Sequence, residues 1–509
     1  MKRSVNTAFL HTLNLTRATL GAIVLLAVAP APLLQAQSAD ALIDKLVDKG
    51  ILTVKEAKDL RQEEDAGFDK AIRAKNGMPT WVKQMKLYGD VRSRYEQINI
   101  EDGQGLGLVD RNRFRYRMRA GVTASMFDNM EAGFRLSSSE PYSSSTTQGD
   151  SISANTTFNN NASRKPVYID LAYGKWTPIN VGGFTLTGTV GKMENPFVTS
   201  EMLFDVDYTP EGGALQAGYE LSDAHKLKAT LGALALMEYQ YSPTDPWLLG
   251  TQVRWDGKYG KRPTDYAWES SLGLSWFGIS GSSYLTNNPS LVFDNSSPGL
   301  AGRNVPNNNA GNSRDLRPVT GANGTIINPY GLMYKYAPFV ADASITYNLR
   351  SMPLYKGVCP LKLAGEFMVN PGAGPYTGGG YYNGFALPGL TNQTVQNKGW
   401  WVGVTLGKAD KRGTWEISYR YQYLEGDAWW DALPDSDYPA FYYTDVNAGT
   451  VYTGTNIKGH IFKGTYALYD SLHFTVKYYL TEQIIPSQAA PPGASSHVGR
   501  LQVDMLWKF

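Results

Sequence analysis

The stretch Arg111–Gly121 reads RNRFRYRMRAG and decides the fold class. Arginine stands at every second position from its start, and Phe114, Tyr116, Met118 and Ala120 fill the positions between. Only a β-strand sorts residues in this way, because successive side chains point to opposite faces. Two interpretations follow: a soluble sheet with a solvated arginine face, or an outer-membrane β-barrel with apolar residues against lipid and arginines in a water-filled lumen.

Composition favours the barrel. The chain has 509 residues with 32 Tyr, 12 Trp and 52 Gly, yet its mean hydropathy is -0.32. Half of each barrel strand faces water, so such proteins are rich in aromatic residues but polar on average. After the N-terminal segment no apolar run approaches the roughly 18 to 20 residues that a spanning helix needs, which excludes a helical membrane protein.

The charge balance and the cysteine count exclude further classes. The net charge is only +2, and Lys and Arg are scattered along the chain, so no nucleic-acid-binding surface is expected. The single cysteine, Cys359, permits neither an intramolecular disulfide nor a cysteine-based metal site. We expect this residue near the start of a strand, and we expect no cofactor and no metal.

The first residues have the features of a secretory signal peptide. Basic residues up to Arg17 precede the apolar run 18–34, and small residues follow it. Cleavage is expected after Ala36 or Ser38, so residues 1–36 are assigned to the signal peptide. A retained inner-membrane anchor is the alternative, which two prolines within the run disfavour.

Residues 37–83 are predicted to form a periplasmic helical hairpin and its linker. Gly50 ends a first amphipathic helix, and Thr53 with Glu56 forms a capping box that opens a second helix. The hairpin could serve as a spacer, as a self-association seam or as a cell-wall contact.

Residues 84–509 are predicted to form an antiparallel barrel of about sixteen strands. The strand-like segments are Lys86–Ile98, Arg111–Ala124, Met130–Ser138, Val167–Thr177, Phe184–Lys192, Ala214–Leu221, Lys226–Tyr241, Leu248–Tyr259, Tyr266–Leu285, Leu332–Leu349, Leu361–Asn370, Gly399–Ala409, Thr414–Glu425, Asn456–Leu468, Leu472–Ile484 and Val498–Phe509. The connections alternate between short and long, as periplasmic turns and external loops do in such barrels. Only the connection at Ser242–Trp247 is short where a long one is expected.

The last segment, HVGRLQVDMLWKF, is specific in its pattern. Leu501, Val503, Met505, Trp507 and Phe509 share one face, and polar residues occupy most of the other. The segment resembles the C-terminal strand by which outer-membrane proteins are recognised for barrel insertion.

Seven stretches resemble landmarks of the bacterial "putative porin" family, whose architecture is similar to that of the phosphate-selective O/P porins. They are LYGDVRSRYE from Leu87, RNRFRYRMRAGVTA from Arg111, VYIDLAYGKW from Val167, TVGKMENPF from Thr189, FDVDYTPEGG from Phe204, WEISYRYQYLEGDA from Trp415 and GTNIKGHIFKGTYAL from Gly454. The resemblance covers nearly all of residues 40–509. It implies an outer-membrane diffusion channel, without implying a particular solute.

The strand faces and the resemblance together give candidate site residues. Pore-lining basic residues are expected at Arg92, Arg94, Arg111, Arg113, Arg115, Arg117, Arg119, Arg420 and Arg500. In sixteen-stranded porins the third external loop folds into the lumen and narrows it. The corresponding loop here is 193–213, with acidic residues at Glu194, Glu201, Asp205, Asp207 and Glu211. The alternative is that the arginines only stiffen the wall by pairing with acidic residues of adjacent strands, namely Asp90, Glu96, Glu131 and Asp170.

A charged neck of this kind would select solutes by its electric field. Further candidates for the inner face are Arg135, Glu416, His473, Lys477, Asp504 and Lys508. Bases exceed acids on this face, which predicts a modest preference for anions or carboxylated solutes. The loop after the thirteenth strand carries five acidic residues within 425–437; it lacks the spacing of an EF-hand, so a solvated acidic loop is predicted rather than a calcium site.

Other function classes have less support. The chain has five histidines, one of which lies in the signal peptide, and it carries no GxSxG or HExxH motif, so no enzymatic activity is expected. A closed structural or adhesive barrel, tethered by the helical hairpin, is the alternative to a channel. The many like-facing charges of the wall favour the channel, because a dry barrel would have to desolvate or pair them.

The expected partners follow from this assignment. They are outer-membrane lipid and lipopolysaccharide, the barrel-assembly machinery through Phe509, and small hydrophilic solutes. The resemblance to porins adds a possible homotrimer.

Overall fold

The computed structural model describes residues 79, 81–101, 110–139, 153–159, 161–238, 245–261, 265–282, 285, 309–316, 319–320, 326–327, 330–375, 381–382, 385–386, 394–445, 448–485 and 495–509. The chain divides into two compact units, Met1–Pro79 and Thr80–Phe509. The predicted signal peptide and helical hairpin lie outside the described residues, and the predicted linker ends two residues too late, because the first strand begins at Val82.

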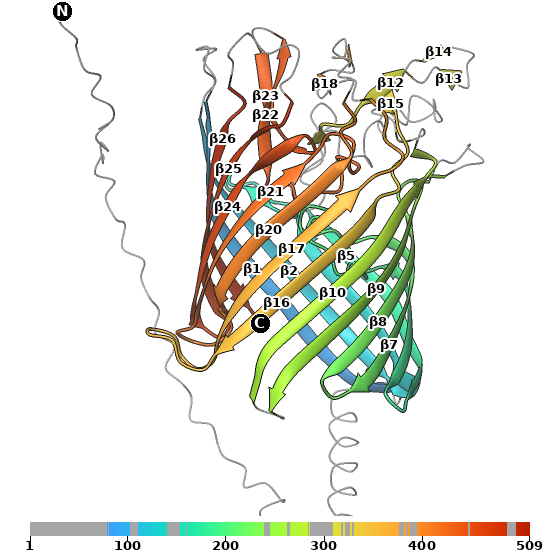
Figure 1. Cartoon of the computed structure of the whole chain (residues 1–509), viewed down its shortest axis with the longest axis vertical. Helices are drawn as coiled ribbons and strands as arrows, with labels where there is room; N and C mark the ends of the chain where they lie inside the picture. Colours follow the sequence, from blue (N-terminus) through green and yellow to red (C-terminus); the bar gives the residue numbers. More distant parts are fainter. Residues whose placement is uncertain are drawn as a thin grey trace, which may run out of the picture. The chain divides into compact units, whose positions relative to one another are not determined.

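Within the described residues, sixteen strands of the second unit form one closed antiparallel barrel (Figure 1). They are β1 (Val82–Ile100), β2 (Arg111–Met126), β3 (Met130–Ser138), β5 (Val167–Val181), β6 (Phe184–Lys192), β7 (Glu211–Ser222), β8 (His225–Ala235), β9 (Trp247–Lys261), β10 (Asp265–Ser280), β16 (Phe339–Leu349), β17 (Cys359–Val369), β20 (Lys398–Gly407), β21 (Trp415–Leu424), β24 (Ile457–Tyr469), β25 (Leu472–Gln483) and β26 (Val498–Lys508). Each strand pairs with its neighbours in chain order, which is the arrangement that the period-two pattern predicted.

The first and last strands close the barrel. Residues Asp90–Ile100 of β1 lie opposite Lys508–Val498 of β26. Phe509 extends this pairing, because its backbone N–H donates to the carbonyl of Gly89 over 3.1 Å and its carbonyl accepts from the N–H of Gly89 over 3.0 Å. The barrel thus has no free sheet edge along this seam.

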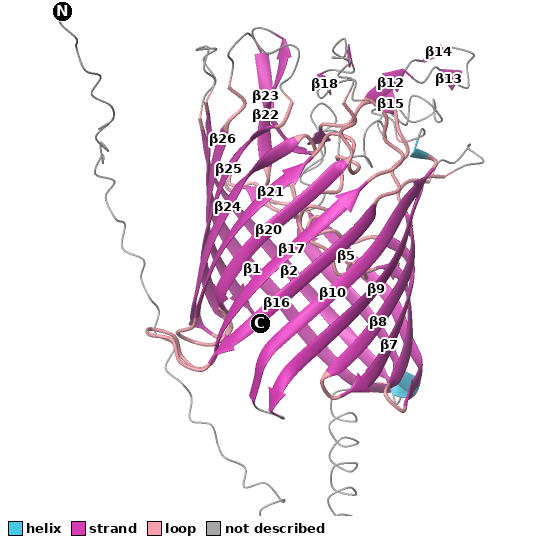
Figure 2. Cartoon of the chain, in the orientation of Figure 1, coloured by secondary structure: helices cyan, strands magenta, loops and turns pink. Residues whose placement is uncertain are grey.

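The short strands belong to the connections at one end of the barrel (Figure 2). They are β4 (Thr156–Thr157), β11 (Asn309–Ala310), β12 (Arg314–Leu316), β13 (Val319–Thr320), β14 (Ile326–Ile327), β15 (Tyr330–Leu332), β18 (Tyr381–Tyr382), β19 (Phe385–Ala386), β22 (Pro439–Asp445) and β23 (Ala448–Gly454). The long-connection end is the external end by the architecture of outer-membrane barrels, and the end with short turns is periplasmic. We number the long connections as loops in chain order.

The short turns use the backbone conformations that tight hairpins need. Between Val181 and Phe184, which pair directly, the two connecting residues are Gly182 and Gly183, with φ of 59° and 79°. Positive φ at both central residues matches the right-handed twist of the flanking strands, and glycine adopts it without steric cost. At another periplasmic turn, β17 begins at the buried Cys359, which confirms the position expected for this residue.

All sixteen predicted segments contain a strand, but three predicted boundaries extend five or more residues beyond it, whereas the other boundaries lie within four residues of those observed. The strand predicted to reach Tyr241 ends at Ala235, the strand predicted to reach Leu285 ends at Ser280, and the strand predicted to begin at Leu332 begins at Phe339. The connection that looked short is therefore residues 236–246, which restores the alternation of short turns and long loops.

The three errors have one physical cause. Met237, Leu285 and Leu332 are 5%, 1% and 1% exposed, and all three belong to one cluster of buried hydrophobic side chains. Their apolar character continues the sequence pattern of the strands. In the structure these three side chains pack in a hydrophobic core at the ends of the strands. The strands therefore end earlier than the apolar pattern predicts.

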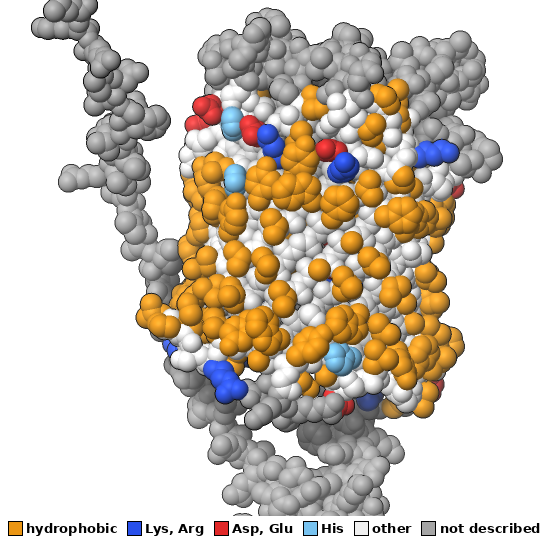
Figure 3. Space-filling model, in the orientation of Figure 1, with side chains coloured by type: hydrophobic (Ala, Val, Ile, Leu, Met, Phe, Trp, Pro, Cys, Tyr) orange, Lys and Arg blue, Asp and Glu red, His pale blue; other side chains and the backbone are white. Residues whose placement is uncertain are grey.

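The alternation of the wall residues is the one expected of a barrel in lipid. On β2, Phe114 and Met118 are 57% and 51% exposed, whereas Arg115 and Arg117 are 5% and 4% exposed. On the face shown in Figure 3, hydrophobic side chains cover the wall and charged ones gather at its two ends. No helix among the described residues is long and apolar enough to cross a membrane.

Candidate functional site

Three adjacent strands carry a basic wall on the inside of the barrel. β1 supplies Arg92 and Arg94, β2 supplies the row that begins at Arg113, and β26 supplies Arg500. The strand register places Arg92 directly opposite Arg117, and Arg94 directly opposite Arg115. Like charges opposite each other destabilise a sheet, so this wall needs carboxylates nearby.

Part of that compensation comes from the wall itself. Asp90 accepts from Arg117 over 3.0 Å and from Arg119 over 2.7 Å. Glu96, which is fully buried, contacts Arg113 Nε over 2.5 Å and Arg500 over 2.6 Å. This is the pairing within the wall that the alternative interpretation described.

Other wall pairs follow the same principle. Arg94 binds Asp504 of β26 through two contacts of 2.7 and 2.9 Å. Arg135 of β3 binds Asp170 of β5 over 2.5 Å. Glu131 differs from the expectation: the hydroxyl of Tyr173 donates to it over 2.9 Å, in place of the expected arginine.

Loop 3, residues 193–210, contacts the inner wall on many strands. Glu194 binds Arg135 of β3 over 2.6 Å. Glu201 lies 3.2 Å from Arg420 of β21 and 3.9 Å from Lys477 of β25. Strands that lie so far apart around the barrel can be reached by one loop only through the interior.

The other three acidic residues of the predicted loop each have different surroundings. Asp207 reaches the basic wall at Arg117, over 2.8 Å, and at Arg119, over 3.1 Å. Asp205 is 3% exposed and accepts backbone N–H groups. Glu211 lies outside the loop, because it begins β7 and pairs with Lys192 over 3.4 Å.

Loop 7, residues 425–456, also folds against the inner wall, and the prediction of a solvated acidic loop was wrong. Its residues 427–438 are mostly buried, including Asp427 and Trp429 at 0% exposure. Asp437 binds Arg94 over 2.9 Å and Arg500 over 2.8 Å. Asp437 of this loop therefore contacts the same basic wall as Asp207 of loop 3.

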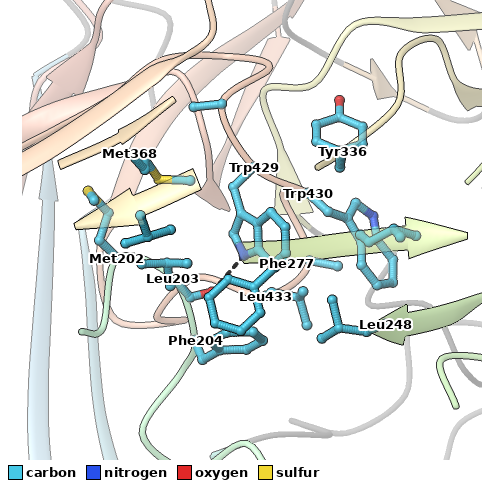
Figure 4. Close-up of a cluster of buried hydrophobic side chains, with 14 of the residues drawn as sticks. Met202, Leu203, Phe204, Leu248, Phe277, Tyr336, Met368, Trp429, Trp430 and Leu433 are labelled. Atoms are coloured by element: carbon cyan, nitrogen blue, oxygen red, sulfur yellow. Dashed lines mark hydrogen bonds between the residues drawn. The ribbon is translucent and has the colours of Figure 1, made fainter. Parts of the chain in front are cut away.

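Loops 3 and 7 pack on each other. The N–H of Asp205 donates to the carbonyl of Leu433 over 2.8 Å, and the N–H of Asp435 donates to the carbonyl of Glu201 over 2.9 Å. The indole N–H of Trp429 donates to the carbonyl of Leu203 over 2.8 Å (Figure 4). The two loops thus behave as one folded body.

A cluster of buried hydrophobic side chains anchors this body to one side of the barrel. It comprises Phe197, Met202, Leu203, Phe204, Leu234, Met237, Leu248, Phe277, Ile279, Leu285, Leu332, Tyr336, Val340, Met368, Leu424, Ala428, Trp429, Trp430, Ala432 and Leu433. The ring of Phe204 meets those of Phe277 and Trp429 edge-on at 5.4 and 5.8 Å between centroids. Asp207 and Asp437 face the basic wall instead, so the loop body is amphipathic.

Buried hydrogen bonds tie loop 5 to loop 7. The carboxylate of Asp427 accepts from the N–H and the hydroxyl of Ser313, over 2.7 and 2.6 Å, and from the hydroxyl of Tyr336 over 3.0 Å. The side-chain amide of Asn312 donates to the carbonyls of Gly426 and Trp429, each over 2.7 Å. These contacts fix the inward course of loop 7.

Burial raises the pKa of Asp427 to about 7, and burial together with the charge of Asp207 raises the pKa of Asp205 to about 7. Both values exceed the 3.8 expected for an exposed aspartate. Burial would also raise the pKa of Asp437, but Arg94 and Arg500 outweigh it and hold that pKa well below 3.8.

These shifts predict a pH dependence of the loop packing. Stabilisation from a protonated Asp205 and Asp427 is fully present below pH 3.8 and is lost as the pH rises to about 7, by about 1.4 kcal/mol per pH unit for each independent group. Asp437 acts in the opposite direction, but only below pH 3.8. Mean channel conductance in planar bilayers should therefore rise between pH 5 and 7 and level off above 7. Asp427→Asn should flatten the rise, and an unchanged slope would contradict this assignment.

The other predicted site residues lie as follows. Arg111 is exposed at the start of β2, and Lys508 is exposed at the end of β26. Arg420 lies over the ring of Trp401, with its guanidinium carbon 4.9 Å from the ring centroid. His473 is 8% exposed. Among the described residues, no group of three or more His, Cys, Asp or Glu side chains is placed to hold a metal ion.

Sequence reasoning missed the role of Asp437 and the burial of loop 7. It also missed Asn155, whose side chain accepts from Arg92 over 2.7 Å, and the pair of Arg254 with Asp342 at 2.7 Å. One signal was available: the four-residue pattern Asp-x-Asp-Tyr occurs in loop 3 at 205–208 and again in loop 7 at 435–438.

Comparison with known families decides the class of the protein. Residues 107–509 match the profile of the family described as "Putative porin". The chain belongs to this family. Family membership and the closed barrel make it a porin of the outer membrane. No curated protein matches the chain.

Several solved structures are similar to the chain at low sequence identity and low TM-score. OprB of Pseudomonas putida has 9% identity and a TM-score of 0.45, with 84% of this chain and 94% of that chain covered. OccK8 (OprE) of Pseudomonas aeruginosa has 9% identity and a TM-score of 0.39, with 85% and 99% covered. The outer-membrane channel DcaP of Acinetobacter baumannii has 11% identity and a TM-score of 0.38, with 84% and 97% covered.

Proposed function

We propose that this porin passes small hydrophilic solutes by passive diffusion and that it modestly prefers anions or carboxylated solutes. The observation that carries the preference is Arg92. Its guanidinium donates to Asn155, and within the described residues it makes no ion pair. A positive charge on the inner wall without a bound carboxylate attracts anions and repels cations, most strongly where the path is narrow.

The narrow part of the path would lie between the basic wall and the body formed by loops 3 and 7. The wall contributes Arg117 and Arg500, and the loops contribute Asp207 and Asp437. Opposite rows of charge orient dipolar solutes as they pass. Transport by this route needs no cofactor and no bond-making step.

A closed structural barrel is the second candidate, and the apolar cluster under loops 3 and 7 favours it. A loop body with a hydrophobic core resists displacement more than a solvated loop does. The two candidates differ in one measurable property, which is ion conductance.

The ion preference can be tested by the reversal potential in a KCl gradient across a planar bilayer. The wild-type protein should show anion selectivity, and Arg92→Gln should lower the anion-to-cation permeability ratio about fivefold, since a unit charge ~8 Å from the path in water contributes about 0.5 kcal/mol, with opposite sign, to the energy of each ion. Lys226→Gln is the matched control, because Lys226 pairs with Glu220 on the exposed surface. Cation selectivity of the wild-type protein would exclude the proposed preference.

The proposal extends to processing and partners. Residues 1–36 would be removed as a signal peptide, and the residues between it and β1 would stay in the periplasm as a helical hairpin and its linker. Phe509 is 66% exposed, and it would be the recognition point for the barrel-assembly machinery. The hydrophobic outer wall would contact lipid and lipopolysaccharide, and three copies could associate as a homotrimer.

A further inference from the structure

Loops 3 and 7 contain the same turn twice. In each Asp-x-Asp-Tyr pattern the first carboxylate accepts the backbone N–H of the second aspartate, over 2.8 Å for Asp205 and Asp207 and over 2.9 Å for Asp435 and Asp437. The carbonyl of the first aspartate also accepts the N–H of the tyrosine, over 3.0 and 3.4 Å. Aspartate turns of this kind are common in loops, so the turn alone indicates no function.

The distinctive feature is where the second aspartate of each turn lies. Asp207 bridges Arg117 and Arg119, and Asp437 bridges Arg94 and Arg500, with contacts between 2.8 and 3.1 Å. Each carboxylate thus joins two guanidinium groups of the wall. Charge-assisted contacts of this type are the strongest hydrogen bonds that side chains form.

The two turns are also joined to each other. The N–H of Ser436 in the second turn donates to the carboxylate of Asp205 in the first, over 3.0 Å. Asp205 and Asp435 are 3% and 6% exposed, so neither turn can leave the wall without disturbing the other. The two turns therefore hold the loop body on the basic wall together. We call the contacts of Asp207 and Asp437 with the wall arginines the clasp.

We infer that Asp207 and Asp437 are internal competitors for a carboxylate-binding site formed by these two arginine pairs. The inference rests on the proposed porin function and gives its site a ligand class and a means of regulation. A solute carboxylate has the charge and the planar two-oxygen geometry of an aspartate side chain. It can take the place of Asp207 or Asp437 on the arginines, and the released aspartate becomes solvated.

This exchange separates carboxylates from other solutes. Each guanidinium keeps a carboxylate partner during the exchange, so little interaction is lost at the wall. A neutral solute offers no such replacement, and chloride lacks the paired oxygens that match the guanidinium. Carboxylated solutes should therefore lengthen the open time of the clasp, whereas in KCl or with neutral solutes the clasp opens only by its own fluctuations and passes solutes more slowly.

The test compares wild type with Asp207→Asn/Asp437→Asn in planar bilayers, in KCl and in potassium acetate at equal conductivity. The turns keep their N–H acceptors in this variant, because those are Asp205 and Asp435. In KCl the mean open time of the variant should be about ten times that of the wild type or longer. The reason is that one charge-assisted hydrogen bond shifts the equilibrium between the closed and the open clasp by at least about a factor of ten. Acetate should raise the open time of the wild type and add nothing in the variant.

The matched control is Asp410→Asn, which removes one carboxylate paired with Lys408 over 3.0 Å in a periplasmic turn. It should behave as wild type in both salts. If the double variant does not fold, each single variant should show part of the increase. A double or single variant that conducts as wild type does would overturn the inference and leave the porin function standing. Folded wild type and variant that are both silent in both salts would overturn the inference and the porin function together.

Discussion

Replacing Trp429 by alanine is expected to release loops 3 and 7 from each other while the barrel wall stays folded. The side chain is fully buried between the loops, and its indole donates to Leu203. Truncating a buried tryptophan costs about 3–5 kcal/mol, and this cost falls on the loop body because Trp429 lies outside the strands. Loop 7 should then become a substrate for chymotrypsin, and channel conductance should increase.

The control for this experiment is Trp400→Ala. Trp400 is 37% exposed on β20 and stacks on Tyr423, with 5.9 Å between ring centroids. This change should leave loop 7 resistant to the protease. If Trp429→Ala is cleaved no faster than wild type, the packing of loops 3 and 7 does not hold the loop body closed.

Glu96→Gln should destabilise the closing seam of the barrel by about 3 kcal/mol. Glu96 lies on β1, is fully buried, and contacts Arg113 of β2 and Arg500 of β26. Removal of one partner of a buried ion pair leaves the other charges desolvated and without full compensation, which costs more than the pair itself contributed. The free energy of unfolding should be measured by urea titration of the refolded protein in lipid vesicles.

Glu220→Gln provides the comparison for this second prediction. Glu220 pairs with Lys226 over 2.5 Å, and both side chains are about half exposed, at 54% and 48%. A surface pair of this kind contributes about 0–1 kcal/mol. Equal losses in the free energy of unfolding for the two variants would show that the buried Glu96 contributes no more to stability than an exposed ion pair does.

Most of the barrel could be predicted because its physics is local. Residues that alternate with period two face lipid on one side of a strand and water on the other. The row from Arg111 to Arg119 therefore predicted a strand from the sequence alone. The strand ends were less predictable. Leu332 and Met237 continue the apolar pattern of their strands, but they serve the cluster beneath the loops, and a pattern of apolar residues does not state which core it fills.

The site was only partly predictable for a related reason. Sequence places the wall arginines on one face, since their spacing is local, but it does not report which distant loops reach them. The acidic residues of loop 7 looked solvated because nothing near them in the chain neutralises them. Their partners, Arg94 and Arg500 for Asp437, lie on other strands that only the closed barrel brings near.

The most direct test of passive diffusion is liposome swelling with neutral sugars. Liposomes that contain the folded, heat-modifiable protein should swell in isotonic solutions of small sugars, and the swelling should slow as the sugar becomes larger. Liposomes with heat-denatured protein should not swell. Absence of swelling with the folded protein inserted, for even the smallest sugar, would contradict the diffusion channel and favour the closed structural barrel.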